Sequence, residues 1–454
     1  MRTHPNFLTT TLAMVIALSS SSRAQDAGAG MAQGGSVRAD GDATGIALGD
    51  DSRSRLHLGA DAGFGFDTNP YTTPLATGDF TGDVAARIRP YVEASMPGSM
   101  IDFRGRAAFD YGALPGVLTP STRSFLLYQA NVSADAEIRR GAPVSFVVGD
   151  TVSLHTDPGV VSLGSLLSRV NNQLRLGVGI TPGGGSLKFR LGVTSTLVHF
   201  FADESADGFV LRDGLLDTLN NTAILRADYR FLPKTGAFVA LTGGWQVYPF
   251  ARRSLPQAFP VGVRLGLQGQ VLAKLSTLLA VGYDNPLVFD ENGLQTGQVA
   301  GLSGQAEAQW APTPATALAI GYRRNFEPVA LYQFLGQNRA YVRASQLLGV
   351  TELYGFLSWS LLEYGEESTG VAECGSGAAG QCDQLTDTPV GRVDHMVAAT
   401  VRASYYVLPW LAIGLSNSLD WRVTNAGTVP TEGVDALNLS YLRNETLLLA
   451  SVRY

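Results

Sequence analysis

Residues 444 to 454 carry the strictest pattern in the chain. Counting back from the aromatic terminus Tyr454, every second residue is apolar, with Val452, Ala450 and Leu448 in phase and the basic Arg453 out of phase. A period of two indicates a β-strand with one apolar and one polar face. Such a strand is stable only beside others of its kind, so earlier segments must repeat the pattern.

Earlier segments do repeat the alternation. Residues 126 to 138 and 261 to 268 separate apolar from polar side chains onto opposite faces, and residues 101 to 104 and 411 to 421 do the same. The clear cases run for nine or more residues, which is enough for a tilted strand to cross a bilayer. A long series of two-faced strands is therefore predicted from residue 53 onward.

Short and long connections alternate between these segments along the chain. Short turns rich in Pro and Gly lie at 97–98, 141–142, 182–185, 233–234, 273–274, 312–314, 348–349 and 408–409. Longer and mostly acidic loops lie near 67–80, 112–123, 156–166, 201–216, 249–257, 285–295, 326–331, 365–389 and 425–436. Eight turns and nine loops join eighteen strands. In outer-membrane barrels, an even strand number accompanies short periplasmic turns and long external loops.

The predicted fold class is therefore all-β, a transmembrane antiparallel up-and-down β-barrel of 18 strands with both termini periplasmic. The phase of the alternation is blurred in residues 332 to 346 and 350 to 364, so a count of sixteen stays open. A soluble β-sandwich would also alternate, but regular loop lengths and aromatic residues near strand ends favour the barrel. Membrane-interface positions are predicted for Trp310, Trp410 and Tyr454.

The composition favours strands over helices as the membrane-crossing elements. The 454 residues are 45% hydrophobic and 16% charged, with a mean hydropathy of +0.09. After residue 24 there is no run of eighteen apolar residues, so no membrane-spanning helix is predicted. A formal net charge of -6 excludes a globally basic nucleic-acid binder.

Three regions are predicted along the chain. Residues 1–24 have the features of a secretory signal peptide, with a basic Arg2, an apolar core and small residues before a cut after about Ala24. Residues 25–52 are too poor in apolar residues for a core and are predicted to be a flexible periplasmic lead-in. Residues 53–454 form the barrel, which export places in the outer membrane of a Gram-negative bacterium.

Cysteine is nearly absent, with only Cys374 and Cys382 in one Gly-rich loop. A disulfide between them is favoured over two free thiols, because an exported protein meets an oxidising compartment. Two cysteines without a nearby histidine are too few for a structural zinc site. No metal or cofactor is therefore predicted.

The polar strand faces point into the predicted barrel and carry more bases than acids. The predicted pore-lining residues are Arg87, Arg89, Arg104, Arg106, Arg190, Arg226, Arg230, Arg264, Arg402, Arg422, Glu93, Asp110, Asp135 and Glu137. Guanidinium groups in a confined aqueous pore attract anions, so the excess of bases favours anionic or carboxylated solutes. For each single arginine, the alternative is an ion pair with a carboxylate on a neighbouring strand. Such a pair would be a structural feature of the water-filled interior and would have no role toward a solute.

No catalytic site is predicted. The mature chain has four histidines, His57, His155, His199 and His395, without a Ser or Asp pattern that would supply a nucleophile and a base. Asp394 and His395 are adjacent on a predicted strand, where neighbouring side chains point to opposite faces and cannot cooperate.

The first predicted hairpin resembles the opening of the β-barrel porin type 2 family of outer-membrane proteins. The similarity rests on Gly63-Phe64-Gly65-Phe66-Asp67-Thr68-Asn69-Pro70, on Gly78-Asp79-Phe80 and on Arg89-Pro90-Tyr91, within about the first sixty barrel residues. The resemblance implies an outer-membrane barrel. Relatives of this kind are often associated with secreted-polysaccharide systems, some as the membrane partner of a periplasmic export protein. We expect no periplasmic domain in this chain, so such a role would need a partner.

Three functions follow as hypotheses. The favoured one is a pore that translocates a secreted polysaccharide across the outer membrane together with a periplasmic export protein. The first alternative is a general diffusion porin for small solutes, anionic ones among them, and the second is a structural or surface-display barrel of an envelope complex. The expected partners are outer-membrane lipid, the export protein and the transported polysaccharide or small anion, with no nucleic acid.

Overall fold

The computed structural model describes residues 46–47, 54–69, 82–98, 100–114, 125–139, 141–155, 169–201, 210–211, 217–249, 257–289, 301–329, 332–365, 381–382, 393–424 and 440–454. Within these residues, eighteen strands of eleven or more residues form nearly all of the regular structure. They are β2 (Arg55–Asp67), β3 (Asp83–Met96), β4 (Ile101–Leu114), β5 (Phe125–Ile138), β6 (Val144–His155), β7 (Arg169–Ile180), β8 (Leu187–Phe200), β10 (Thr218–Leu232), β11 (Thr235–Val247), β13 (Val261–Leu272), β14 (Leu275–Asn285), β16 (Gly301–Thr313), β17 (Thr316–Val329), β18 (Tyr332–Leu348), β19 (Thr351–Tyr364), β21 (Val393–Leu408), β22 (Leu411–Thr424) and β23 (Tyr441–Arg453). The shorter strands have two residues each and are β1 (Ile46–Ala47), β9 (Val210–Leu211), β12 (Gln257–Ala258), β15 (Val288–Phe289) and β20 (Gln381–Cys382).

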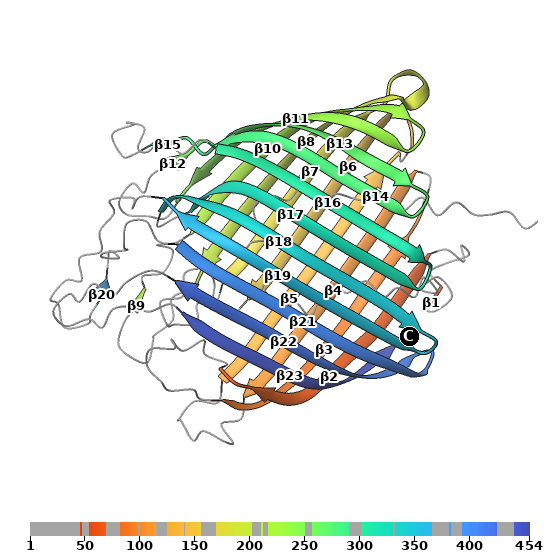
Figure 1. Ribbon diagram of the computed structural model, residues 1–454, viewed down its shortest axis with the longest axis vertical. Helices are drawn as coiled ribbons and strands as arrows, with labels where there is room; N and C mark the ends of the chain where they lie inside the picture. Colours follow the sequence, from red (N-terminus) through yellow and green to blue (C-terminus); the bar gives the residue numbers. More distant parts are fainter. Residues whose placement is uncertain are drawn as a thin grey trace, which may run out of the picture.

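The long strands form one closed antiparallel barrel (Figure 1). Each long strand pairs with the next long strand along the chain, and the sheet closes where β23 pairs with β2. This register runs from Gly59 opposite Arg453 to Asp67 opposite Glu445. The predicted closed antiparallel β-barrel of eighteen strands is confirmed. The periplasmic side of both termini stays a prediction. Among the described residues, no helix has the length and apolar character needed to cross a membrane.

The two ends of the barrel differ in their connections. At the short-turn end, adjacent strands are joined by tight turns such as that between Leu232 and Thr235, while the long-loop end carries the longer connections.

One predicted loop is wrong. β17 continues to Val329 and β18 begins at Tyr332, so the loop predicted at 326–331 shrinks to residues 330 and 331. β2 begins and β23 ends at the short-turn end, so both ends of the barrel segment lie there.

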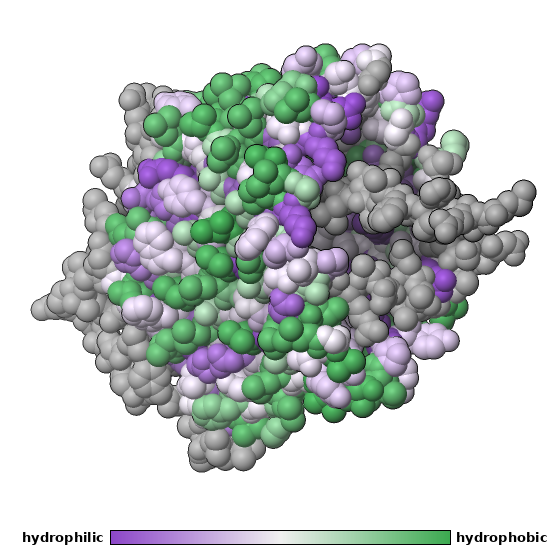
Figure 2. Space-filling view, turned by 45° about the vertical axis from the view of Figure 1, so that its right-hand side comes forward, coloured by the Kyte–Doolittle hydropathy of each residue, from purple (hydrophilic) through white to green (hydrophobic). Residues whose placement is uncertain are grey.

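The outer wall carries the apolar strand faces. Leu265 on β13 is 57% exposed and Leu448 on β23 is 59% exposed, and Figure 2 shows apolar side chains spread over the wall. Exposed aromatic residues gather toward the short-turn end at Phe146, Phe189, Tyr229, Phe231, Trp310, Tyr405, Trp410 and Tyr454, and toward the long-loop end at Phe64, Phe66, Tyr111, Trp245, Tyr283, Trp359 and Trp421. The structure thus places the three predicted interface residues in the first belt. Two aromatic belts around an apolar band are typical of membrane barrels.

The blurred phase of residues 332 to 364 has a physical cause. On the inner wall, apolar Leu335 and Leu362 are buried together with Tyr364. On the outer wall, Arg324 and Glu363 form an ion pair at 3.8 Å. Apolar residues inside and charged residues outside weaken the period-two signal in the sequence, although the backbone pairing of β17, β18 and β19 is continuous through this region.

Three aromatic rings of the inner wall lie over glycines on the neighbouring strand. The directly opposed pairs are Tyr91 with Gly59, Phe238 with Gly266, and Tyr341 with Gly321. A Cβ atom at Gly59 would come within 2.2 Å of the Tyr91 ring. Glycine at these positions therefore lets each ring lie flat against the wall, where it takes little space from the lumen.

The Asp67-Thr68-Asn69 segment, which carries part of the family resemblance, holds the closing seam. Arg443 on β23 donates from Nε to Asp67 at 2.8 Å. The Thr68 amide donates to the Asn444 carbonyl at 2.9 Å, and the Asn444 amide donates to the Thr68 hydroxyl at 2.8 Å. The buried Asn69 side chain donates to a backbone carbonyl of β23. We call Asp67, Thr68, Asn69, Arg443 and Asn444 the clasp.

The other end of this seam is closed by the carboxy-terminal residue. Leu58 and Tyr454 exchange two backbone hydrogen bonds of 2.9 and 2.8 Å. Beyond that point, β1 pairs with Arg55 and Leu56 at the start of β2. β1 comes from the predicted lead-in, so part of that segment extends the paired edge of the first barrel strand.

Two predictions fall outside the described residues. The predicted signal peptide, residues 1–24, is one of them. The other is the disulfide, because Cys374 lies outside the described residues, although Cys382 lies in β20, which pairs with β9. Both remain predictions.

The clasp yields a stability prediction. Asp67→Asn is expected to destabilise the barrel by about 3–5 kcal/mol, because Arg443 is largely buried and would lose its charge partner. Urea unfolding in lipid vesicles, followed by gel mobility, measures the change. Arg104→Gln is the control, since Arg104 is 67% exposed and lies 3.7 Å from Asp102, and it should cost less than about 1 kcal/mol. If the two variants lost the same free energy of unfolding, the stabilising role of the clasp would be refuted.

Closure yields a second prediction. Deleting residues 441 to 454 is expected to abolish the folded barrel, because the edges of β2 and β22 would present unpaired backbone groups to lipid. Heat-modifiable migration on a denaturing gel reports the folded barrel. A truncated chain that still inserted as a heat-modifiable species would refute the closure.

Candidate functional site in the barrel lumen

Every predicted pore-lining residue lies on the inward face of its strand. The outward direction is marked by exposed apolar residues, such as Ile88 on β3, which is 50% exposed between the inward-facing Arg87 and Arg89. The inward positions are Arg87, Arg89 and Glu93 on β3; Arg104, Arg106 and Asp110 on β4; Asp135 and Glu137 on β5; Arg190 on β8; Arg226 and Arg230 on β10; Arg264 on β13; Arg402 on β21; and Arg422 on β22. The lumen is therefore the candidate site.

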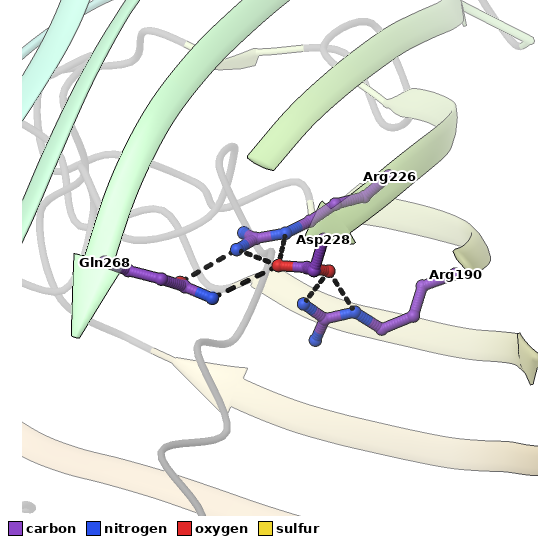
Figure 3. Close-up of polar contacts among 4 residues, drawn as sticks. All are labelled: Arg190, Arg226, Asp228 and Gln268. Carbon is purple, nitrogen blue, oxygen red and sulfur yellow. Dashed lines mark hydrogen bonds and ion pairs between the residues drawn. The ribbon is translucent and has the colours of Figure 1, made fainter. Parts of the chain in front are cut away.

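A network on β8, β10 and β13 shows how the inner wall offsets its charge (Figure 3). Asp228 lies 2.6 Å from Arg190 through one carboxylate oxygen and 2.7 Å from Arg226 through the other. Gln268 donates to Asp228 at 3.1 Å and accepts from Arg226 at 2.8 Å. The guanidinium of Arg226 also lies 3.8 Å over the Phe238 ring. Two bases share one acid, so the network keeps one positive charge.

Near the long-loop end, bases and acids are matched and buried. Arg422 pairs with Asp394, with 2% and 0% of their side chains exposed, and Arg422 also donates to the Tyr364 hydroxyl at 3.3 Å. Arg87 pairs with Glu445 at 2.8 Å beside the clasp. Buried pairs of this kind hold each other in place and leave little net charge for a solute.

Cross-strand pairs engage further predicted residues. They join Arg89 to Asp110 at 2.6 Å, Arg264 to Asp284 at 2.7 Å, and Arg175 to Asp135 at 2.8 Å. In the first two pairs a neighbouring strand supplies the partner, as expected for side chains that face each other across a sheet. Arg175 on β7 instead reaches Asp135 on β5 across β6, where Gly149 has no side chain. The ion-pair alternative therefore describes most of the predicted arginines.

A second group of inward-facing bases forms no ion pair with a described carboxylate. Its members are Arg106, Lys188, Arg230, Arg343, Arg402 and Arg453. All of them lie in the halves of their strands that are nearest to the short-turn end. We call them the unpaired bases. In register, Glu93 lies directly opposite Arg106 and Asp228 lies directly opposite Lys188, but none of the six bases is within ion-pair distance of a described carboxylate, in contrast to the buried pairs near the long loops.

The sequence pattern missed several inward-facing charges near strand ends. They include Asp67, Arg169, Asp284, Asp394, Arg443 and Glu445, and the pattern also missed Arg339 in the middle of β18. Arg443 and Glu445 are in phase with Ser451 and Arg453 on the same strand. Extending the alternation further back along the last strand would therefore have found them.

The adjacent Asp394 and His395 are separated as predicted. Asp394 faces inward against Arg422, whereas His395 faces outward and stacks on Trp359 with ring centroids 6.0 Å apart. The two side chains therefore cannot act together. Among the described residues, there is no group of three or more His, Cys, Asp and Glu side chains that could hold a metal ion.

Solved membrane barrels are similar to the chain at low sequence identity. The FrpB iron transporter of Neisseria meningitidis is 10% identical with a TM-score of 0.44, covering 88% of this chain and 81% of that chain. OccK1 (OpdK) of Pseudomonas aeruginosa is 11% identical with a TM-score of 0.41, covering 88% and 99%. The siderophore receptor PirA of Pseudomonas aeruginosa is 9% identical with a TM-score of 0.38, covering 88% and 80%. These similarities carry no information about function.

No curated protein sequence matches the chain significantly. A family model described as "Putative beta-barrel porin 2" matches residues 56–336. The matched range begins in β2, includes Asp67, Thr68 and Asn69 of the clasp, and ends in β18. Because this range is more than half of the chain, the protein belongs to the Putative beta-barrel porin 2 family of outer-membrane β-barrels.

Proposed function

We propose that this barrel is a pore for anionic solutes, with its short-turn end toward the periplasm. The observation that carries the proposal is the group of unpaired bases on the inner wall. An eighteen-stranded barrel is wide enough to hold an aqueous channel, and guanidinium groups that keep their charge in such a channel attract anions.

The charge along the barrel axis supports this proposal. The short turns contain the bases Arg139, Arg140, Lys234 and Lys274 and no Asp or Glu, whereas the long connections contain most of the acids outside the strands. The lumen is therefore flanked by basic connections at the end that carries the unpaired bases. An anion approaching that end meets attraction before it enters.

A carboxylated polysaccharide is the cargo that we favour. The family resemblance supports an association with polysaccharide export, and the inner wall carries aromatic rings beside unpaired bases, a combination that suits acidic sugars. A periplasmic export protein would deliver the chain to the short-turn end. Small anionic solutes, which a general diffusion porin would pass, are the other candidate cargo for the same charged lumen.

The charge proposal predicts a change in ion selectivity. Arg106→Gln combined with Arg230→Gln is expected to lower the anion preference, because neither side chain forms an ion pair with a carboxylate in the described part of the chain. The anion preference is measured as the reversal potential in a salt gradient across a planar bilayer. The control is Arg264→Gln with Asp284→Asn, which removes a matched pair at 2.7 Å and keeps the net charge. A wild-type barrel without anion preference would refute the proposal.

The cargo proposal predicts a surface phenotype. Cells that lack the gene should lose secreted acidic polysaccharide from their surface, because the outer membrane would block its exit. Staining and uronic-acid assay of the cell coat measure the loss, with restoration by the intact gene as control. An unchanged coat, together with slower uptake of small anions by the cells, would favour the diffusion porin instead.

A further inference from the structure

Two bases and two aromatic rings occupy consecutive positions on the inner wall of β18, β19 and β21. Arg343 on β18 lies opposite Phe356 on β19, and Tyr354 on β19 lies opposite Arg402 on β21. All four face inward, because their chain neighbours Leu357, Val342 and Val401 are 52%, 47% and 61% exposed on the outer wall. The register thus places the rings between the two bases, in the half of the barrel nearest to the short turns.

The geometry keeps these side chains available to a solute. Arg402 donates from Nε to the Ser404 hydroxyl at 3.2 Å, which leaves its terminal amino groups for another acceptor. Arg343 is exposed to the lumen, and neither base forms an ion pair with a described carboxylate. The ring of Phe356 lies beside Tyr341, with centroids 6.4 Å apart, and the guanidinium of Arg339 lies 5.8 Å from the Phe356 centroid. Tyr354 is therefore the ring of the pair without an aromatic or cation–π contact among the described residues.

Nearby carboxylates accept hydrogen bonds from tyrosines of the same wall. Glu352 accepts from the Tyr406 hydroxyl at 2.7 Å, and Glu307 accepts from the Tyr341 hydroxyl at 2.7 Å. The Asp228 network on the facing part of the barrel differs, because there a carboxylate binds both arginines directly. Glu352 and Glu307 keep their negative charges, but neither forms an ion pair with Arg343 or Arg402, whereas Asp228 binds Arg190 and Arg226 directly.

We infer that Arg343, Tyr354, Phe356 and Arg402 form a binding subsite for a carboxylated sugar unit. A guanidinium group binds a carboxylate through two parallel hydrogen bonds. An aromatic ring presents a flat apolar face with a negative quadrupole, which suits the C–H face of a sugar ring. An acidic peptide would use the bases but not the rings. The inference rests on the proposed function in one respect, that the anionic cargo passes through the lumen.

Single-channel recording tests the subsite with oligogalacturonate as the carboxylated probe. Maltohexaose is the neutral sugar probe and oligoglutamate the acidic peptide probe. Oligogalacturonate is expected to block the current more strongly than either. Arg343→Gln with Arg402→Gln should weaken its apparent affinity by about tenfold or more, since a hydrogen bond to a charged group contributes roughly 1.5–3 kcal/mol. Tyr354→Leu should lower the apparent affinity for oligogalacturonate and leave the apparent affinity for oligoglutamate unchanged.

Lys188→Gln with Arg230→Gln is the matched control. It removes two unpaired bases from the same half of the lumen, on β8 and β10, away from the four subsite residues. The control variant should shift the reversal potential as the subsite variant does. Its affinity for oligogalacturonate should stay within about twofold of the wild-type value, because salt screens the attraction between the probe and charges that lie far from it. Heat-modifiable migration checks that each variant is folded.

The outcomes separate the subsite from the pore. Equal loss of affinity in the control and subsite variants would mean that general lumen charge binds the probe, and would overturn the subsite while the anion pore stands. Equal binding of maltohexaose, or no effect of Tyr354→Leu, would overturn it as well. Calorimetry on the detergent-solubilised barrel measures the same binding without current. A barrel that binds oligogalacturonate but lacks anion selectivity would refute the proposed pore alone.

Discussion

A backbone amide or carbonyl that faces lipid without a partner costs several kcal/mol, because no water is present to bind it. A sheet in the membrane must therefore close, and here it closes between β23 and β2. The clasp holds this seam at the long-loop end, and the Leu58–Tyr454 exchange holds it at the other. β1 then pairs with β2 beyond the last residue of β23, where the seam would otherwise end.

Closure also determines what the inside of the barrel contains. A period of two sends alternate side chains inward, so a wall that faces lipid with Leu, Val and Ile must face the lumen with the other half of each strand. Acids on the same or a nearby strand offset many of the bases, as Asp228 on β10 does for Arg190 on β8 and for Arg226 on β10. The inward-facing bases that form no ion pair with a described carboxylate all lie in the half of the barrel nearest to the short turns.

Glycine contributes to the lumen in a second way. Where Gly59, Gly266 and Gly321 lack a side chain, Tyr91, Phe238 and Tyr341 lie flat against the wall. The guanidinium of Arg226 then stacks on Phe238 at 3.8 Å, so it stays at the wall instead of crossing the channel. A row of large inward side chains can thus be accommodated while the centre of the barrel is left for a solute.

The sequence pattern was enough to predict a barrel, the inward and outward strand faces and aromatic residues near the strand ends, because a period of two is a local property that each strand displays alone. It favoured eighteen strands and left sixteen open. It failed where that signal is weak, as at Leu335 and Leu362, which are apolar but buried inside, and at Arg324 and Glu363, which are charged but face outward. Only the tertiary structure decided which bases are neutralised. Arg443 meets Asp67 across the closing seam, while Arg343 and Arg402 flank two rings and no acid pairs with them among the described residues. The physical reason is that an ion pair depends on register between strands, and register is a property of the closed sheet as a whole.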